Sequence, residues 1–155
     1  MLSEGEKQAI LHEAAKYPLK AAAAPEALKI VQAAHRWVSD EHLVEAAALL
    51  EMSPAQLDAV ATAYNLIYRQ PVGRHVILIC DSVSCWIMGY PKLKAHLLGR
   101  LGIEALGETS PDGRFTLLPI PCLGLCEQAP ALMIDADLHG NLTPEKMDQI
   151  LSMYE

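Results

Sequence analysis

The sequence predicts an α+β fold in which an N-terminal helical bundle is followed by a domain that mixes strands and helices. Residues 1–70 place apolar side chains every three to four positions, which is the spacing of a helix face. The later part of the chain instead contains short, β-branched apolar runs. The turn-rich stretch RQPVGR, residues 69–74, separates the two patterns. We therefore expect two domains, at residues 1–70 and 71–155.

The composition favours a soluble cytosolic protein. The chain of 155 residues is 52% hydrophobic, which is enough for a core, and has a net charge of −7. An acidic protein repels phosphate backbones, so we expect no nucleic-acid partner. No apolar run approaches the roughly 18 residues of a membrane span, and the opening MLSEGEKQ is too polar for a signal peptide. In the cytosol thiols stay reduced, and clustered cysteines bind metal more often than they form disulfides.

Four helices are expected within residues 1 to about 68. They are LSEGEKQAILHEAAKY, APEALKIVQAAHRWV, EHLVEAAALL and a segment that begins after Ser53. The start of the fourth helix is the clearest, because Ser53 suits the N-cap, Pro54 the first position and Gln56 the third position of a capping box. Short connections between amphipathic helices indicate a compact bundle.

The second part of the chain alternates strands with helices. Short apolar runs predict buried strands at HVILIC (75–80), FTLLPI (115–120) and ALMID (131–135). A helix is expected from about Pro91 to Leu101, a return strand at LHGNL, and a last helix that begins at Thr143 and Pro144. A strand–helix–strand crossover makes the first two strands parallel neighbours. This order of elements is the layout of a thioredoxin-like α/β domain.

All four cysteines lie in two motifs, CDSVSC and CLGLC, separated by 36 residues. Cys80 ends the first predicted strand and Cys122 follows the second, so parallel strands would bring both motifs to one edge of the sheet, with each pair in a loop. Four thiolates that converge in this way can hold tetrahedral zinc or an iron–sulfur cluster. The spacing leaves both possibilities open, together with a disulfide or unrelated thiols.

Two features weigh against the alternatives to an iron–sulfur cluster. Structural zinc usually staples a unit with a poor core, and this half has enough apolar residues to fold without zinc. A thiol oxidoreductase has C-x-x-C at a helix start, and neither pair has that spacing. Trp86, next to Cys85, suits either the shielding of a cofactor or ordinary packing, and Asp81 and Glu127 are expected to face water.

The chain resembles the E subunit of the bacterial respiratory NADH:quinone oxidoreductase, complex I, over nearly its whole length. The matching stretches are YRQPVGRHVI, CDSVSC with the later Gly89, DGRFTLLP, CLGLC and HGNLTPEK. The resemblance implies a thioredoxin-like ferredoxin domain that binds one [2Fe-2S] cluster. The ligands that it implies are Cys80, Cys85, Cys122 and Cys126, with the first two on one iron and the last two on the other.

The resemblance also implies a reaction and its partners. In this family the E subunit packs against a flavoprotein subunit that holds FMN and binds NADH, and the cluster exchanges an electron with the flavin. We therefore expect an electron-transfer subunit of NADH dehydrogenase that also contacts further complex I subunits. Its expected place is the peripheral arm of a membrane-bound complex, on the cytoplasmic side of the inner membrane, without membrane insertion. No phosphate-binding loop or Ser-His-Asp arrangement is visible, so we expect no NADH site and no catalytic residue in this chain.

Two alternative functions stay open. The nearest is the same [2Fe-2S] module in an NAD-linked hydrogenase or formate dehydrogenase, although CDSVSC resembles the respiratory form more closely than a CTGTAC-like motif. The alternative from a different class is a zinc-stapled interaction module with no redox role. Colour distinguishes the last one, because iron–sulfur proteins absorb visible light and zinc proteins are colourless.

Overall fold

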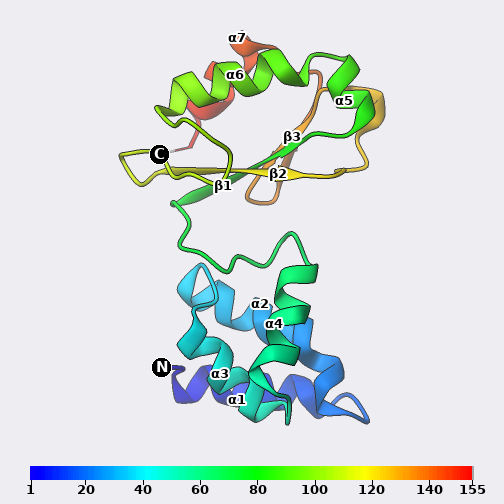
Figure 1. The fold of residues 1–155 in the computed structure, drawn as a ribbon, viewed down its shortest axis with the longest axis vertical. Helices are drawn as coiled ribbons and strands as arrows, with labels where there is room; N and C mark the ends of the chain where they lie inside the picture. Colours follow the sequence, from blue (N-terminus) through cyan, green and yellow to red (C-terminus); the bar gives the residue numbers. More distant parts are fainter. Residues whose placement is uncertain (155) are drawn as a thin grey trace. The chain divides into compact units, whose positions relative to one another are not determined.

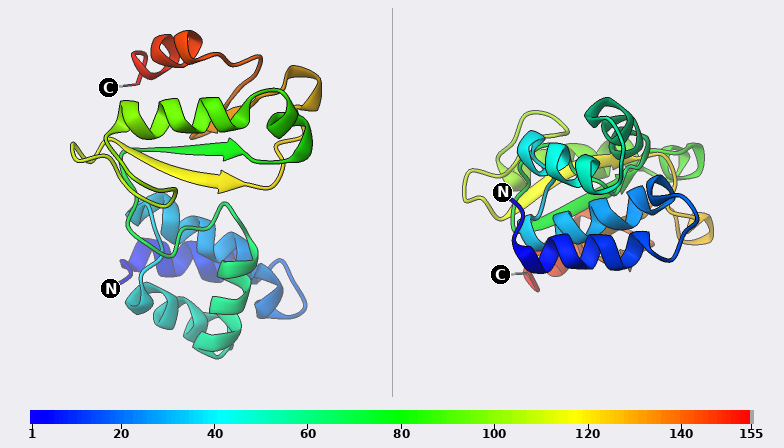
Figure 2. Two further views of the ribbon diagram at one scale, coloured as in Figure 1. Left: turned by 45° about the horizontal axis from the view of Figure 1, so that its top comes forward. Right: turned by 90° about the horizontal axis from the view of Figure 1, so that it is seen from below.

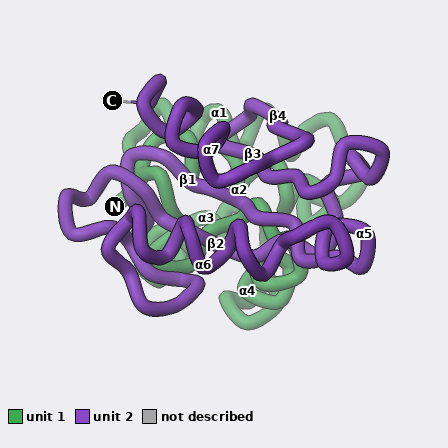
Figure 3. Tube along the Cα trace, turned by 90° about the horizontal axis from the view of Figure 1, so that it is seen from above, with its two compact units in different colours: residues 1–71 green, residues 72–155 purple. Residues whose placement is uncertain are grey.

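The computed structural model describes residues 1–154 of the chain. They divide into two compact units, unit 1 at residues 1–71 and unit 2 from residue 72 onward, which Figure 3 shows in green and purple. Unit 1 is helical, and unit 2 combines a four-stranded sheet with helices, so the α+β class is confirmed. Within residues 1–154, no helix has the length and apolar character needed to cross a bilayer.

Unit 1 contains the four expected helices and one short 3₁₀ turn that the sequence does not predict (Figure 1). These elements are α1 (Glu4–Ala14), η1 (Lys20–Ala23), α2 (Ala24–His35), α3 (Asp40–Leu49) and α4 (Pro54–Ala63). Helices α1, α3 and α4 each begin after a serine whose side chain accepts a backbone N–H bond, namely Ser3, Ser39 and Ser53. Ser53 and Gln56 form the predicted capping box, which satisfies two backbone donors of the first turn.

The core of unit 1 is built from all four helices. Its fully or almost fully buried side chains include Ile10, Leu28, Val31, Leu43 and Leu57. The spacing of Leu57, Val60, Ala61 and Tyr64 in the sequence predicts one apolar face of α4. This is only partly correct, because Tyr64 adopts extended backbone after the end of the helix and is exposed.

The chain segment that follows α4 is attached to unit 1 by hydrogen bonds. Gln32 donates from Nε2 to the carbonyl of Leu66 and accepts the N–H of Tyr68 at Oε1, both at 2.7 Å. Arg69 donates from Nε to Asp58 Oδ1 at 2.8 Å. These bonds satisfy backbone groups of a segment without regular structure and fix its path as far as residue 69.

Unit 2 contains a sheet with the strand order β2-β1-β3-β4 (Figure 1). Its elements are β1 (His75–Cys80), α5 (Val83–Ile87), α6 (Tyr90–Leu101), β2 (Phe115–Ile120), η2 (Cys126–Gln128), β3 (Leu132–Ile134), β4 (Asp137–His139) and α7 (Pro144–Leu151). Strands β1 and β2 are parallel, whereas β3 is antiparallel to both β1 and β4. The parallel pair and the hairpin are therefore confirmed, although β4 begins one residue earlier than the expected return strand and ends at His139.

Helices α6 and α7 lie on the same face of the sheet, as Figures 1 and 2 show. Leu93 and Leu97 of α6 are buried, and His96 and Asp148 join the two helices through a contact of 3.0 Å between Nε2 and Oδ1. Helix α6 ends at Gly102, which adopts the left-handed conformation with φ of 67°, as the sequence predicts for a glycine at a helix end.

Two histidine rings of unit 1, those of His35 and His42, stack on each other. The ring of His42 stacks on the ring of His35 with 3.9 Å between centroids, and among residues 1–154 its buried Nδ1 has no hydrogen-bond partner. Burial, and then the charge of His35, lower the pKa of His42, while Glu6 and Glu45 oppose this shift. Below the ordinary histidine pKa of about 6.5 the unfolded state therefore binds more protons than the folded state.

We expect the stability of the wild-type chain to fall as the pH drops through about 6.5, because proton uptake favours the unfolded state. Urea unfolding followed by circular dichroism on either side of that pH measures the loss. The loss should be smaller in His42→Phe, which keeps an aromatic ring for the stack but cannot bind a proton. His139, whose pKa burial also lowers, is present in both proteins and contributes equally. Equal losses in the two proteins would contradict the prediction.

Candidate functional site

The two cysteine motifs lie at the same end of the sheet in unit 2. The parallel register places Cys80 opposite Ile120. Ile120 is the last residue of β2 and stands two positions before Cys122 in the chain. The N–H of Asp81 donates to the carbonyl of Ile120 at 3.1 Å, and the N–H of Cys80 donates to the carbonyl of Ala131 at 3.2 Å. Figure 1 shows α5 and the connection from β2 to β3 at this end. Parallel pairing thus brings both motifs to one edge of the sheet.

The expectation that each cysteine pair sits in a loop is wrong for two of the four residues. Cys85 lies in the middle of the short helix α5, and Cys126 is the first residue of the 3₁₀ turn η2. Ser82 before α5 is a residue type common at N-caps, and Gly89 after it adopts the left-handed conformation. The sequence does not predict α5, because five residues are too few to show helical periodicity. Ser82 and Gly89 are the signals from which its two ends could have been predicted.

The cysteines of the first motif are buried and contact each other. Cys80 and Cys85 are 3% and 2% exposed, whereas Cys122 and Cys126 are exposed. Burial, and then the hydrogen bond with Cys80, raise the pKa of Cys85 to about 11. With its pKa raised in this way, the Cys85 thiol keeps its proton unless a cation replaces it, which is the condition that metal binding meets.

Cys122 of the second motif accepts a hydrogen bond from a backbone amide. The N–H of Gly124 donates to Cys122 Sγ at 3.3 Å. Gly124 adopts the left-handed conformation that glycine accommodates, with φ of 72°. Electrostatic interaction with Cys126 is a smaller cause of the raised pKa of Cys85.

The donor set fits a two-iron cluster. Within the described part of the chain, no three His, Cys, Asp or Glu side chains gather closely enough to hold a single metal ion. A [2Fe-2S] cluster instead takes two cysteines on each iron, so its requirement is two thiol pairs facing each other. Cys80, Cys85, Cys122 and Cys126 all lie at one end of one sheet, so four free cysteines are available there for such a cluster.

The residues around the cysteines are exposed apolar side chains at α5 and two exposed acidic side chains. Val83, Trp86, Ile87 and Met88 are 69%, 58%, 76% and 59% exposed, and we call these four residues the α5 patch. Trp86 is therefore not a core residue, although its ring stacks on Tyr90 with 5.3 Å between centroids. Asp81 and Glu127, the acidic residues next to Cys80 and Cys126, are both exposed, as expected.

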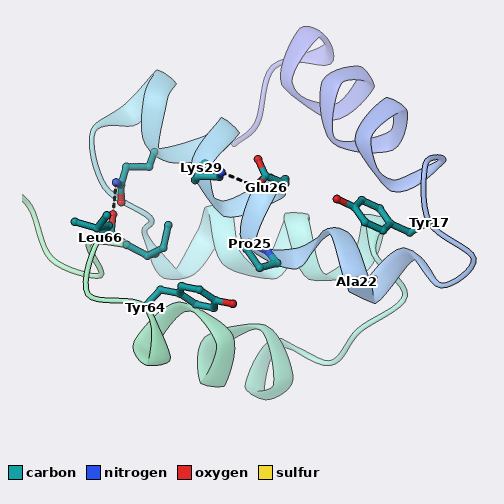
Figure 4. Close-up of a pocket in the computed structure, with 9 residues that line it drawn as sticks. Tyr17, Ala22, Pro25, Glu26, Lys29, Tyr64 and Leu66 are labelled. Atoms are coloured by element: carbon teal, nitrogen blue, oxygen red, sulfur yellow. Dashed lines mark hydrogen bonds and ion pairs between the residues drawn. The ribbon is translucent and has the colours of Figure 1, made fainter. Parts of the chain in front are cut away.

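Unit 1 contains a separate cavity of about 520 Å³, shown in Figure 4. Tyr17 and Tyr64 contribute to its lining, together with Pro25. Its two charged residues, Glu26 and Lys29, pair with each other at 2.6 Å. The cavity therefore offers no unpaired charge for a ligand, and the cysteine site is the better candidate for function.

Comparison with known proteins identifies the family. Residues 10–155 match the family model of the thioredoxin-like [2Fe-2S] ferredoxins. The chain belongs to this family. Among relatives of this ferredoxin, the E subunit of the NADH-quinone oxidoreductase of Pseudomonas aeruginosa is 46% identical over 99% of this chain and 92% of the relative. The corresponding subunit of Escherichia coli is 48% identical with the same coverage. The resemblance to the E subunit is therefore confirmed, and the relatives are subunits of an oxidoreductase.

The ferredoxin is also similar to a chain of a solved hydrogenase. The crystal structure of an NAD⁺-reducing [NiFe]-hydrogenase in the air-oxidized state matches with a TM-score of 0.68 and 25% identity. The match covers 81% of this ferredoxin but 22% of the hydrogenase chain. The hydrogenase chain thus contains a similar module as a small part of its length.

Proposed function

We propose that this ferredoxin binds one [2Fe-2S] cluster and is an electron-transfer subunit of a respiratory NADH:quinone oxidoreductase. The ligands are Cys80, Cys85, Cys122 and Cys126, with the first two on one iron and the last two on the other. Two observations together carry this proposal. Two motifs with two cysteines each lie at one end of the sheet, and the relatives of the chain are E subunits of that complex. When bound, the cluster supplies a carrier for one electron.

The protein residues define the environment in which that electron is held. Burial of Cys80 and Cys85 keeps water from one side of the site, whereas exposure of Cys122 and Cys126 leaves the other side open. The amide of Gly124 directs its N–H at Cys122 Sγ, which stabilises additional negative charge at the sulfurs. Since Asp81 and Glu127 are exposed, water and salt weaken their opposition to reduction.

The α5 patch supports a protein partner at this site. Its four side chains are all more than half exposed; Val83, Trp86 and Ile87 lie on the same short helix as the buried Cys85, and Met88 is the C-cap residue of that helix. Exposed apolar patches of this kind mark protein interfaces. We propose that the flavoprotein subunit, which holds FMN and binds NADH, covers the patch and that its flavin exchanges an electron with the cluster. Further complex I subunits are proposed as partners of the assembled pair.

Two features of the comparisons rank the possible complexes. The relatives from NADH-quinone oxidoreductase share 46% and 48% identity with this chain, whereas the NAD⁺-reducing hydrogenase shares 25%. We therefore place the ferredoxin in the peripheral arm of a membrane-bound respiratory complex, on its cytoplasmic side. The same module in an NAD-linked hydrogenase is the second candidate, supported by the TM-score of 0.68.

Metal and sulfide analysis of the full chain, purified without oxygen, tests the proposal. About two irons and about two acid-labile sulfides per chain are expected for one [2Fe-2S] cluster. The protein should be brown and should give an EPR signal after reduction with dithionite. One zinc per chain without sulfide would refute the proposal and favour a zinc-stapled interaction module.

The midpoint potential of the bound cluster should be low. Ligation by four cysteines places plant-type ferredoxins at roughly −400 mV, so a value of a few hundred millivolts negative is expected. A redox titration followed by EPR measures it. A clearly positive midpoint would contradict ligation by four cysteines, because replacing cysteine with histidine is what raises such potentials.

A further inference from the structure

The turn after β4, at residues 140–142, lies against the segment that joins η2 to β3. The N–H of Asn141 donates to the carbonyl of Gln128 at 2.5 Å. The N–H of Leu142 donates to the carbonyl of Pro130 at 3.2 Å. Two backbone hydrogen bonds therefore join this turn to the end of η2 and to the segment that follows it.

The approach at Gly140 is too close for any other residue. A Cβ atom at this position would lie 2.5 Å from the Cβ and 2.9 Å from the carbonyl oxygen of Gln128. Its φ lies outside the left-handed region, so space rather than backbone conformation requires glycine here. Lys146 Nζ donates to the carbonyl of Gly140 at 2.6 Å and fixes the turn from the side of α7.

The segment that this turn contacts is connected to three of the four candidate ligands. The N–H of Ala129 donates to the carbonyl of Cys126 at 3.3 Å. The carbonyl of Ala131 accepts the N–H of Cys80 at 3.2 Å, and the backbone of Ala131 also hydrogen-bonds Cys85. A displacement of this segment would therefore move the contacts of both cysteine motifs at once.

We propose that Gly140 is a positioning residue for the cysteine site, acting through Gln128 on the segment that connects Cys126 to the sheet. This inference rests on the proposed [2Fe-2S] function and adds a residue that is not a ligand. Groups that orient ligands affect metal binding strongly even though they never touch the metal.

The test compares Gly140→Ala with Gly99→Ala in the full chain. Gly99 lies within α6, and a Cβ atom added there would meet no other part of the protein within 4 Å, so it controls for the loss of a glycine. In Gly140→Ala, iron transfer to a chelator should become faster by on the order of 10-fold, and the EPR line shape of the reduced protein should change. In Gly99→Ala both should match the wild type.

A rescue separates positioning from general damage. The double variant Gly140→Ala with Gln128→Gly removes the Cβ contact of 2.5 Å and keeps the carbonyl contact of 2.9 Å, so it should restore slow iron release in part. Gly140→Ala with Gln128→Ala keeps that Cβ and should not restore it.

A second variant covers the case in which Gly140→Ala does not fold. Lys146→Met removes the hydrogen bond to the Gly140 carbonyl and should accelerate iron release, by less than the 10-fold or so expected of Gly140→Ala. Lys92→Met removes the same charge from the exposed side of α6 and should leave iron release unchanged.

The outcomes distinguish this inference from the function on which it rests. A wild-type chain without iron would refute the proposed function itself. A wild-type chain with iron, together with unchanged release and EPR in Gly140→Ala, would overturn only the positioning role. Failure of Gly140→Ala to fold, with no effect of Lys146→Met, would overturn it as well.

Discussion

Replacement of any one of Cys80, Cys85, Cys122 and Cys126 by alanine is expected to abolish or severely reduce assembly of the [2Fe-2S] cluster. In the proposed ligand set each iron has two protein ligands, so the loss of one thiolate would remove both charge and geometry from that iron. Iron and sulfide content per chain and the EPR signal after reduction measure the effect.

The control for these variants is Ser84→Ala, which changes a neighbouring residue of the same CDSVSC motif without removing a sulfur. It should retain wild-type iron content. Far-UV circular dichroism is needed most for the alanine variants of Cys80 and Cys85, because these two side chains are buried and the other two are exposed. A normal EPR signal in all four alanine variants would show that the ligand assignment is wrong.

Placing a charge in the α5 patch is expected to weaken binding of the flavoprotein subunit without loss of iron. In Ile87→Asp a carboxylate replaces the side chain that is 76% exposed in the free chain and would be buried in the proposed interface. Central interface residues contribute about 2 kcal/mol or more, which corresponds to an affinity roughly 30-fold lower. Affinity measurements between the full chain and the purified flavoprotein subunit test this.

Leu138→Asp is the matched control, since Leu138 is 51% exposed on β4 and lies outside the α5 patch. It introduces the same charge and should leave the affinity unchanged. If both variants bind like the wild type, the α5 patch is not the docking surface. If Ile87→Asp also loses iron, the weaker binding reflects damage to the site rather than to an interface.

Several elements could be predicted from the sequence because their causes are local. The strands at residues 75–80 and 115–120 have the predicted bounds, since short β-branched apolar runs bury well as strands. The capping box at Ser53 and the left-handed glycine at Gly102 are also present, because both motifs depend on residues within one turn. The order of these elements was sufficient to predict a parallel pair of strands and a shared edge for both cysteine motifs.

The proposed ligand set and partners were predicted from the family resemblance and not from local sequence patterns. The spacing of the cysteines left zinc and iron–sulfur binding open, and the resemblance to the E subunit of complex I supplied the choice between them. Family membership is shown by a match over residues 10–155, whereas the four ligands and the flavoprotein partner stay predictions.

The sequence by itself determined the longer helices, the strands and the grouping of four cysteines in two motifs. Only the tertiary structure decided that Cys85 is buried within a helix while Cys122 is exposed, and that Gly140 must pass against Gln128. The reason is physical: caps, turns and apolar periodicity act between residues a few positions apart. Burial and close backbone approach instead depend on which distant segments the sheet brings together.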